Sequence, residues 1–357
     1  MQNFSALWRE RHFLFLSEES GLLAFLLFRS FSPAWPQPKA HPNCSAASPV
    51  VETAVGIMLT LECALGLTGN AVALWTFFYR LRVWKPYAVY LFNLVVADLM
   101  LATCLPFLAV FYLKGKTWEL GHASCRVLLF LLAFSRGVGV AFLTMVALDR
   151  YLRVVHSRLR VNLLTLRTAW GISILVWLLM VALTPQNLVT HGAIQNLTKC
   201  PSFYPIGETE ASAAWQEVLF FLQLLLPFGL IFFCNTGLIR TLQDRLRESG
   251  KQPRLQRARA LVAIVLLLFG LCFLPSVLTR VLVHIFRELG SCHVQQAIVQ
   301  ASDVTGSLTC LHSALSPAIY CFSNQAFTHS YRKVLRSLRG WRKAAESASS
   351  NIRHSYS

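Results

Sequence analysis

The chain has 357 residues, of which 55% are hydrophobic and only 14% are charged, and its mean hydropathy is +0.51. A soluble domain of this length needs fewer apolar residues for its core, so the composition excludes an ordinary soluble enzyme or binding module and indicates a membrane protein. The formal net charge of +17 would suit a nucleic-acid partner, but the basic residues gather between apolar segments, which argues against one.

The first 50 residues contain one apolar stretch, residues 21–28, followed by a proline-rich segment at 32–42. The stretch is shorter than the ~20 residues that cross a bilayer, and no small-residue cleavage site follows it, so we predict no signal peptide. We expect residues 1–50 to form an extracellular N-terminal tail.

Seven apolar segments follow, and each is long enough to cross ~30 Å of hydrocarbon as a helix. The seventh is interrupted by Asp303, His312 and Pro317, so hydropathy alone would miss it, and we expect it to face other helices rather than lipid. The sequence therefore predicts an all-α membrane protein, with a seven-transmembrane helix bundle over 51–322. The expected helices cover residues 51–79, 87–112, 124–149, 168–190, 213–239, 259–286 and 295–322.

Most of the 33 Lys and Arg residues lie in the first, third and fifth connections between these segments and after the seventh. Short cytoplasmic connections carry an excess of Lys and Arg, so this distribution predicts an extracellular N-terminus and a cytoplasmic C-terminus. In the segment 323–357, Phe327, Tyr331 and Val334 recur at helical spacing among basic residues, which predicts a short amphipathic helix on the inner membrane surface and then a polar cytoplasmic tail.

Two arginines, Arg136 and Arg150, lie in the third apolar segment. They are separated by about 21 Å of helix and share one face, which must point into the bundle because each would cost about 2.5–3.5 kcal/mol in lipid. Arg136 has no acidic residue at helical spacing, and an unpaired guanidinium in a dry interior is a site for a carboxylate. The alternative is an ion pair between Arg136 and Glu62 or Asp98 on neighbouring helices.

The sequence Asp149-Arg150-Tyr151, at the end of the third segment, has matching motifs in the other segments. Together these motifs resemble the class A (rhodopsin-like) G-protein-coupled receptors, and the resemblance covers residues 42–357. The other motifs are Gly69-Asn70, Asp98 in LVVADL, Cys125, Trp177, Pro227, Cys272-Phe273-Leu274-Pro275 and Ser316-Pro317-Ala318-Ile319-Tyr320.

The resemblance implies that Arg150 contacts a heterotrimeric G protein of the Gi/o class on activation, with arrestin as a further partner, and that Tyr320 moves inward to support Arg150. The residues that it assigns to coupling and activation are Asp149, Arg150, Tyr151, Asp98, Phe273, Pro275, Pro317 and Tyr320. The chain departs from the class pattern at Phe273, Asn235, Ser316, Leu255 and Gly139, and the last replaces a serine that helps bind sodium near Asp98.

Four cysteines, Cys44, Cys125, Cys200 and Cys292, lie on the expected extracellular side. An even number in an oxidising compartment predicts two disulfides, with three pairings open. The resemblance implies Cys125–Cys200, which leaves Cys44–Cys292. The sequons at Asn43 and Asn196 lie on the same side and predict glycosylation.

Within the class, Arg136, Arg280, Trp118 and the sequence Cys200-Pro201-Ser202-Phe203 resemble the hydroxycarboxylic acid and oxoeicosanoid receptor group. The resemblance implies a plasma-membrane receptor in which Arg136 binds the carboxylate of an anionic lipid, a hydroxylated eicosanoid fatty acid. A small hydroxy or keto acid is the alternative ligand. The ligand-binding residues that this reading assigns are Arg136, Trp118, Ser202 and Phe203, with Arg280 or His284 steering the anion.

Other proteins with several membrane helices fit the sequence less well. A retinal-binding pump would need a lysine in the seventh segment, which has none. A transporter of organic anions would place charges at mid-membrane, but neither inverted repeats nor paired broken helices are present. The sequence has no GxSxG or HExxH motif, so we predict no catalytic residue, cofactor or metal site. A constitutively active receptor is the remaining alternative within the class.

Overall fold

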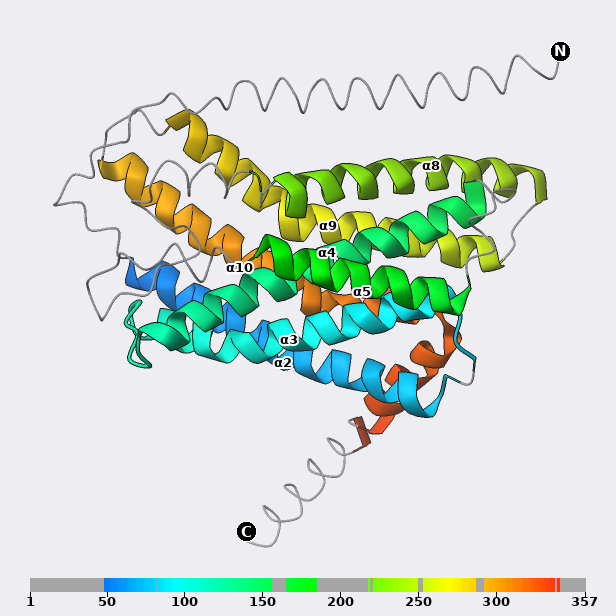
Figure 1. Cartoon of the computed structure of the whole chain (residues 1–357), viewed down its shortest axis with the longest axis horizontal. Helices are drawn as coiled ribbons and strands as arrows, with labels where there is room; N and C mark the ends of the chain where they lie inside the picture. The colour runs from blue at the N-terminus through cyan, green and yellow to red at the C-terminus, as the bar shows by residue number, and fades with distance from the viewer. Residues whose placement is uncertain are drawn as a thin grey trace, which may run out of the picture.

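The structure, a computed structural model, describes residues 48–81, 83–155, 165–184, 218, 221–249, 253–286, 292–337 and 339–340. Long helices lie side by side along one axis and form an elongated bundle (Figure 1). Seven of them correspond in order to the predicted segments, which confirms the predicted fold class. They are α2 (Pro49–Tyr79), α3 (Pro86–Leu113), α4 (His122–Val155), α5 (Leu166–Leu183), α8 (Leu226–Ser249), α9 (Pro253–Phe286) and α10 (Cys292–Ser323).

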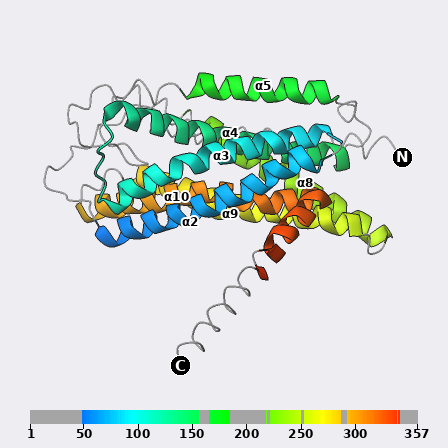
Figure 2. The same ribbon diagram turned by 90° about the horizontal axis from the view of Figure 1, so that it is seen from below.

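The described part of the chain contains six helices that are long and apolar enough to cross a membrane, and α10 is not one of them. Helix α10 instead packs between α2 and α9, an arrangement that Figure 2 shows from below. Its polar residues Asp303, Ser307 and His312 are buried inside the bundle, and Asp303 accepts a hydrogen bond from Tyr112 of α3. The prediction that the seventh segment faces helices rather than lipid is confirmed.

The helix starts follow from local sequence. Pro86 and Pro253 begin α3 and α9, because proline lacks the N–H that the first turn leaves unpaired. The side chain of Thr165 caps α5 by accepting from the backbone N–H of Thr168. The predicted end of the fourth segment and start of the fifth, residues 185–190 and 213–217, lie outside the described residues.

A π turn, η3 (Phe221–Leu225), directly precedes α8, and Pro227 follows one residue into that helix. Proline cannot donate to the carbonyl of the preceding turn, and a local widening of the helix to π geometry is a common response to such a break. The fifth segment therefore bulges inward near Gln223, which becomes part of the site described below.

Helix α5 lies at the edge of the bundle, which Figure 2 shows clearly. Ala169, Ser173 and Met180 are its buried residues, whereas Leu175 and Leu178 are more than 60% exposed. Apolar side chains exposed over a whole helix face would be unfavourable in water, and they suit contact with lipid tails. The exposed face of α5 therefore agrees with a membrane-spanning bundle.

A further helix covers residues 325–337 and leaves the bundle at an angle after α10 (Figure 1). Asn324 caps it by accepting from the N–H of Ala326, 3.0 Å away. Phe327 is buried and packs edge-on against Phe77 of α2, and the Tyr331 hydroxyl donates to the Gly69 carbonyl. Burial raises the pKa of that hydroxyl, so it remains a donor. The predicted amphipathic helix is confirmed.

Candidate ligand and coupling sites

Arg136 lies on α4 with its side chain turned into the bundle. Its Nη1 atom donates to the Thr309 hydroxyl of α10 over 2.9 Å, and the Thr309 hydroxyl in turn donates to the Gly306 carbonyl. In the described part of the chain no carboxylate lies within ion-pair distance of Arg136. The guanidinium is therefore held by a neutral partner, and most of its five N–H groups remain for an anion.

Two further polar groups lie beside Arg136. Arg280 of α9 is half-buried and is close enough for the two positive charges to repel each other. Gln223 of the π turn packs against Gly137, the residue next to Arg136, and its buried Nε2 donor has no hydrogen-bond partner. Two cations and a free amide donor favour a negatively charged ligand group between α4, α9 and η3.

The alternative ion pairs of Arg136 are not formed in the structure. Glu62 is only 1% exposed, but neither of its carboxyl oxygens has a hydrogen-bond partner. Asp98 bonds instead to the Tyr320 hydroxyl, 3.0 Å away, and lies 3.6 Å from the imidazole of His312. The prediction that Arg136 has no protein counter-ion agrees with these contacts.

Asp98, Asn70 and Tyr320 form a buried polar cluster in the centre of the bundle. The Tyr320 hydroxyl lies 3.2 Å from Asn70 Oδ1 as well as near Asp98, and the Asn70 amide donates to the Ser313 carbonyl over 2.8 Å. His312 is buried and fixed by its Nδ1 contact with the Thr309 carbonyl. The cluster joins α2, α3 and α10 at the broken turn of Pro317.

Gly139 leaves the space that His312 occupies. A Cβ atom at position 139 would lie 2.8 Å from His312 Nε2, and the imidazole is packed on its other side by Phe273, with ring centroids 5.3 Å apart. A serine at this position, as in the class pattern, would collide with the ring. The absence of a side chain at Gly139, a departure from the class pattern, therefore makes room for the His312 ring.

We expect Gly139→Ala to destabilise the protein by about 1–3 kcal/mol, the usual cost of overpacking a core. Thermal unfolding of the purified chain in detergent would show a lower midpoint. His312→Ala should recover most of the loss in the double variant, since it removes the colliding ring. Gly171→Ala is the control, because a Cβ there meets nothing within 4 Å. A Gly139→Ala midpoint equal to that of the control would contradict this packing.

The connection between α3 and α4 closes the end of the bundle beyond Arg136. Trp118 is buried and donates to the Gly121 carbonyl over 2.8 Å. Lys116, in the left-handed region with φ 60°, places its ammonium 2.5 Å from the buried Asp303 carboxylate. Tyr112 donates to the other oxygen of Asp303 over 2.7 Å. Trp118 therefore stabilises the connection between α3 and α4. The sequence did not predict the ion pair between Lys116 of this connection and Asp303 of α10.

At the opposite end of the bundle, Arg150 and Asp149 are not paired with each other. Asp149 accepts both bonds from Arg153 Nε, each of 2.9 Å, whereas the Arg150 guanidinium stacks on the Tyr87 ring at 4.6 Å. Arg150 Nε and Nη2 are buried donors without a hydrogen-bond partner. Tyr151 packs against Gly237 of α8, where an added Cβ would lie 2.8 Å from the ring.

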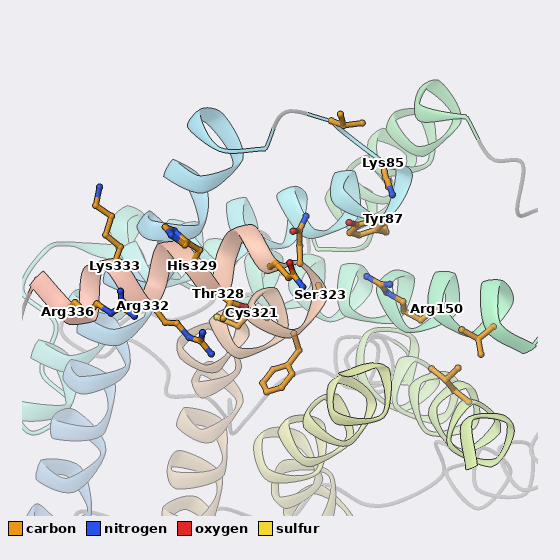
Figure 3. Close-up of a pocket in the computed structure, with 16 residues that line it drawn as sticks. Lys85, Tyr87, Arg150, Cys321, Ser323, Thr328, His329, Arg332, Lys333 and Arg336 are labelled. Atoms are coloured by element: carbon orange, nitrogen blue, oxygen red, sulfur yellow. Dashed lines mark hydrogen bonds between the residues drawn. The ribbon is translucent and has the colours of Figure 1, made fainter. Parts of the chain in front are cut away.

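Arg150 and Tyr87 line a cavity of about 1250 Å³ that opens at this end (Figure 3). The cavity lies between the ends of α3, α4, α8 and α10 and the 325–337 helix. Its lining combines apolar and neutral polar residues with six basic side chains, and it includes no Asp or Glu. The basic side chains are those of Lys85, Arg150, His329, Arg332, Lys333 and Arg336. An open, basic cavity with unpaired donors at its base suits the insertion of a protein segment.

The remaining predicted coupling residues lie between the two sites. Phe273 is fully buried and stacks on Phe269 with ring centroids 4.5 Å apart. Pro275 and Pro317 lie inside α9 and α10, where each removes one backbone hydrogen bond and allows the helix to bend.

Several predictions fall on parts of the chain that the structure does not describe. Cys125 is disulfide-bonded, which agrees with a bridge at this position, but Cys200 lies outside the described residues. His284 and Cys292 belong to α9 and α10, and the placement of their side chains is not described. The other residues outside the described part are Cys44, Asn43, Asn196, Ser202 and Phe203.

The bundle, its two polar sites and the proline-broken helices define a seven-helix membrane receptor. Residues 69–320 match the family described as "7 transmembrane receptor (rhodopsin family)", and the chain belongs to this family. It is therefore a multi-pass membrane receptor.

Particular receptors are similar to this chain over most of its length. It is 82% identical to the mouse (Mus musculus) 12-(S)-hydroxy-5,8,10,14-eicosatetraenoic acid receptor over 88% of the chain and 99% of that protein. It is 62% identical to the human (Homo sapiens) receptor of the same name, with the same coverage. Human hydroxycarboxylic acid receptor 2 is 37% identical over 78% of the chain and 76% of its own length. The resemblance to this receptor group is confirmed.

Proposed function

We propose that the protein is a plasma-membrane receptor for 12-(S)-hydroxy-5,8,10,14-eicosatetraenoic acid that signals through a heterotrimeric G protein of the Gi/o class. The observation that carries the proposal is Arg136, a guanidinium inside the bundle whose described partner is a neutral hydroxyl. A fatty-acid carboxylate supplies the missing counter-charge, and an apolar helix bundle suits its long hydrocarbon chain.

The bundle has two arrangements, and the ligand shifts the equilibrium between them because it binds one more tightly than the other. Its carboxylate binds Arg136, which also contacts α10 through Thr309, so binding changes the forces between α4 and α10. Below this contact, Asp98 and Tyr320 join α3 to α10, and Arg150 lies at the cavity. A shift of α10 at Arg136 would therefore also displace Tyr320 relative to Asp98, and this change favours a different arrangement of the cavity end.

The orientation and the remaining site residues belong to the same proposal. The Cys125 end of the bundle is extracellular and the Arg150 end is cytoplasmic, with arrestin as a second partner at the cavity. Cys125 pairs with Cys200, and Cys44 with Cys292, while Asn43 and Asn196 carry glycans. Ser202 and Phe203 line the mouth of the ligand site, and Arg280 or His284 steers the anion toward Arg136.

Nucleotide exchange on purified Gi heterotrimers, added to membranes that contain this chain, tests the proposal. The hydroxy fatty acid should stimulate exchange, whereas its methyl ester, which lacks the charge, should be about a hundredfold weaker. Lactate in the same assay tests the small-acid alternative. An equal response to acid and ester would show that Arg136 does not bind the ligand carboxylate. Nucleotide exchange that is high and that no acid changes would favour a constitutively active receptor.

A further inference from the structure

The basic residues of the 325–337 helix are arranged on one face. His329, Arg332, Lys333 and Arg336 follow the i, i+3, i+4, i+7 pattern that places side chains on a single stripe of a helix. All four line the cavity of Figure 3 on the side away from Arg150. All four are exposed, so the stripe is accessible to an external ligand as well as from the cavity.

No acidic residue compensates these charges within the described chain. The described ion pairs include none with Arg332, Lys333 or Arg336, and no carboxylate lines the cavity. Like charges three and four residues apart on a helix repel each other. The helix therefore carries repulsion that an external anion would remove.

A fifth basic residue completes the cluster from α2. Arg80 Nη1 lies 2.6 Å from His329 Nδ1, and because a guanidinium can only donate, Nδ1 is the acceptor. His329 Nε2 then carries the proton and can donate to a further oxygen. Arg80 also lies over the Trp75 ring at 5.2 Å, and Trp75 is 40% exposed. Tryptophan partly exposed at the end of a spanning helix is typical of the membrane interface.

We propose that Arg80, His329, Arg332, Lys333 and Arg336 bind the polyphosphorylated headgroup of a phosphoinositide in the adjoining leaflet. The cluster carries four permanent cations and one N–H donor, which is more positive charge than a single carboxylate or phosphodiester can neutralise. A headgroup with several phosphates supplies the negative charge that matches it. A lipid, rather than a soluble phosphate compound, is the source that the surroundings favour. Trp75 and Leu335, which is 53% exposed, present apolar surface beside the cluster, where the acyl chains of the lipid would lie.

The test measures binding of fluorescent phosphatidylinositol 4,5-bisphosphate to the purified full-length chain in nanodiscs of phosphatidylcholine. Each basic residue near a membrane surface contributes roughly a fivefold factor in affinity. The double variant Arg332→Gln/Arg336→Gln should therefore bind about thirtyfold more weakly. Arg167→Gln, an exposed arginine at the start of α5 and outside the cavity lining, should change affinity less than twofold. The variant Arg332→Lys/Arg336→Lys keeps both charges and should retain most of the binding. It shows whether the weaker binding of the Gln variant comes from lost charge or from a folding defect.

Two further arms identify the anion. Nanodiscs that contain phosphatidylserine at the same total charge should not compete, because a single carboxylate and phosphodiester cannot occupy the cluster. Soluble inositol 1,4,5-trisphosphate should compete weakly, since it lacks the acyl chains. Equal competition by phosphatidylserine would show that the cluster attracts any anionic lipid without specificity. Strong binding of the soluble compound would show that the ligand is a free phosphate compound rather than a lipid. Unchanged affinity in the double Gln variant would overturn the proposal directly.

Discussion

Replacement of Arg136 by alanine should lower the potency of the hydroxy fatty acid about a hundredfold or more in the Gi nucleotide-exchange assay. Truncation of one partner of a buried, hydrogen-bonded charge pair typically costs about 2–5 kcal/mol, and ~2.7 kcal/mol already corresponds to a hundredfold. The variant should need more ligand for the same response, and exchange without ligand should persist. Within the described part of the chain, the hydrogen bond from Arg136 to α10 is a single one, to the neutral Thr309 hydroxyl.

Three controls separate recognition from folding. Arg136→Lys keeps the charge but not the planar fork, so we expect an intermediate potency. Thr309→Val removes the neutral partner and should have a small effect, since the guanidinium keeps its charge for the ligand. Lys114→Ala removes an exposed cation that pairs with Glu119 at the same end of the bundle and should leave potency unchanged. An Arg136→Ala receptor with the parent's potency would place the ligand elsewhere.

Most of the fold could be predicted from the sequence, because lipid imposes a simple length and polarity requirement on each helix. The seventh helix shows the limit of that argument. Its polar residues lower its hydropathy below that of a typical span, and only the order of motifs along the chain identified it. The reason is visible in the structure, where the Asp303 carboxylate is bound by Tyr112 of α3 and by Lys116 of the following connection, and His312 Nδ1 contacts the Thr309 carbonyl of α10 itself.

The ligand site could be predicted only in part. The spacing of Arg136 from the acidic residues of its own segment predicted a guanidinium without a counter-ion, and the described contacts agree. Thr309 and Gln223 could not be predicted, because both are brought to Arg136 by helices more than 80 residues away. The position of Gln223 depends further on the π turn before Pro227, and hydrophobic periodicity carries no signal for such a turn.

The coupling site shows why neighbours in sequence are not neighbours on a helix. Asp149 and Arg150 are adjacent, but consecutive residues point about 100° apart, whereas residues four apart lie on one face. Asp149 therefore pairs with Arg153, and Arg150 is left to stack on Tyr87. The motif predicted that Arg150 is functional. That its guanidinium stacks on the Tyr87 ring follows only from the packing of α3 against α4.

Replacement of Arg150 by alanine should abolish ligand-stimulated exchange while ligand affinity changes less than about threefold. Arg150 lies at the cavity end of α4, and 14 residues or about 21 Å of helix separate it from Arg136, so the ligand does not touch it. Its two buried donors without a partner are available to carbonyl groups of an inserted G-protein segment, and charge-assisted bonds of this kind are the strong ones.

The matched control is Arg153→Ala, which removes an arginine three residues further along the same helix. Arg153 is paired with Asp149 and is not among the cavity-lining residues, so we expect exchange to remain within about threefold of the parent. Tyr87→Leu should lie between the two, because it removes the ring that holds the Arg150 guanidinium but leaves its charge. Radioligand binding on the same membranes checks that each variant is folded. If Arg150→Ala and Arg153→Ala lose exchange equally, the cause is the loss of positive charge near the membrane, and the donors of Arg150 have no specific role.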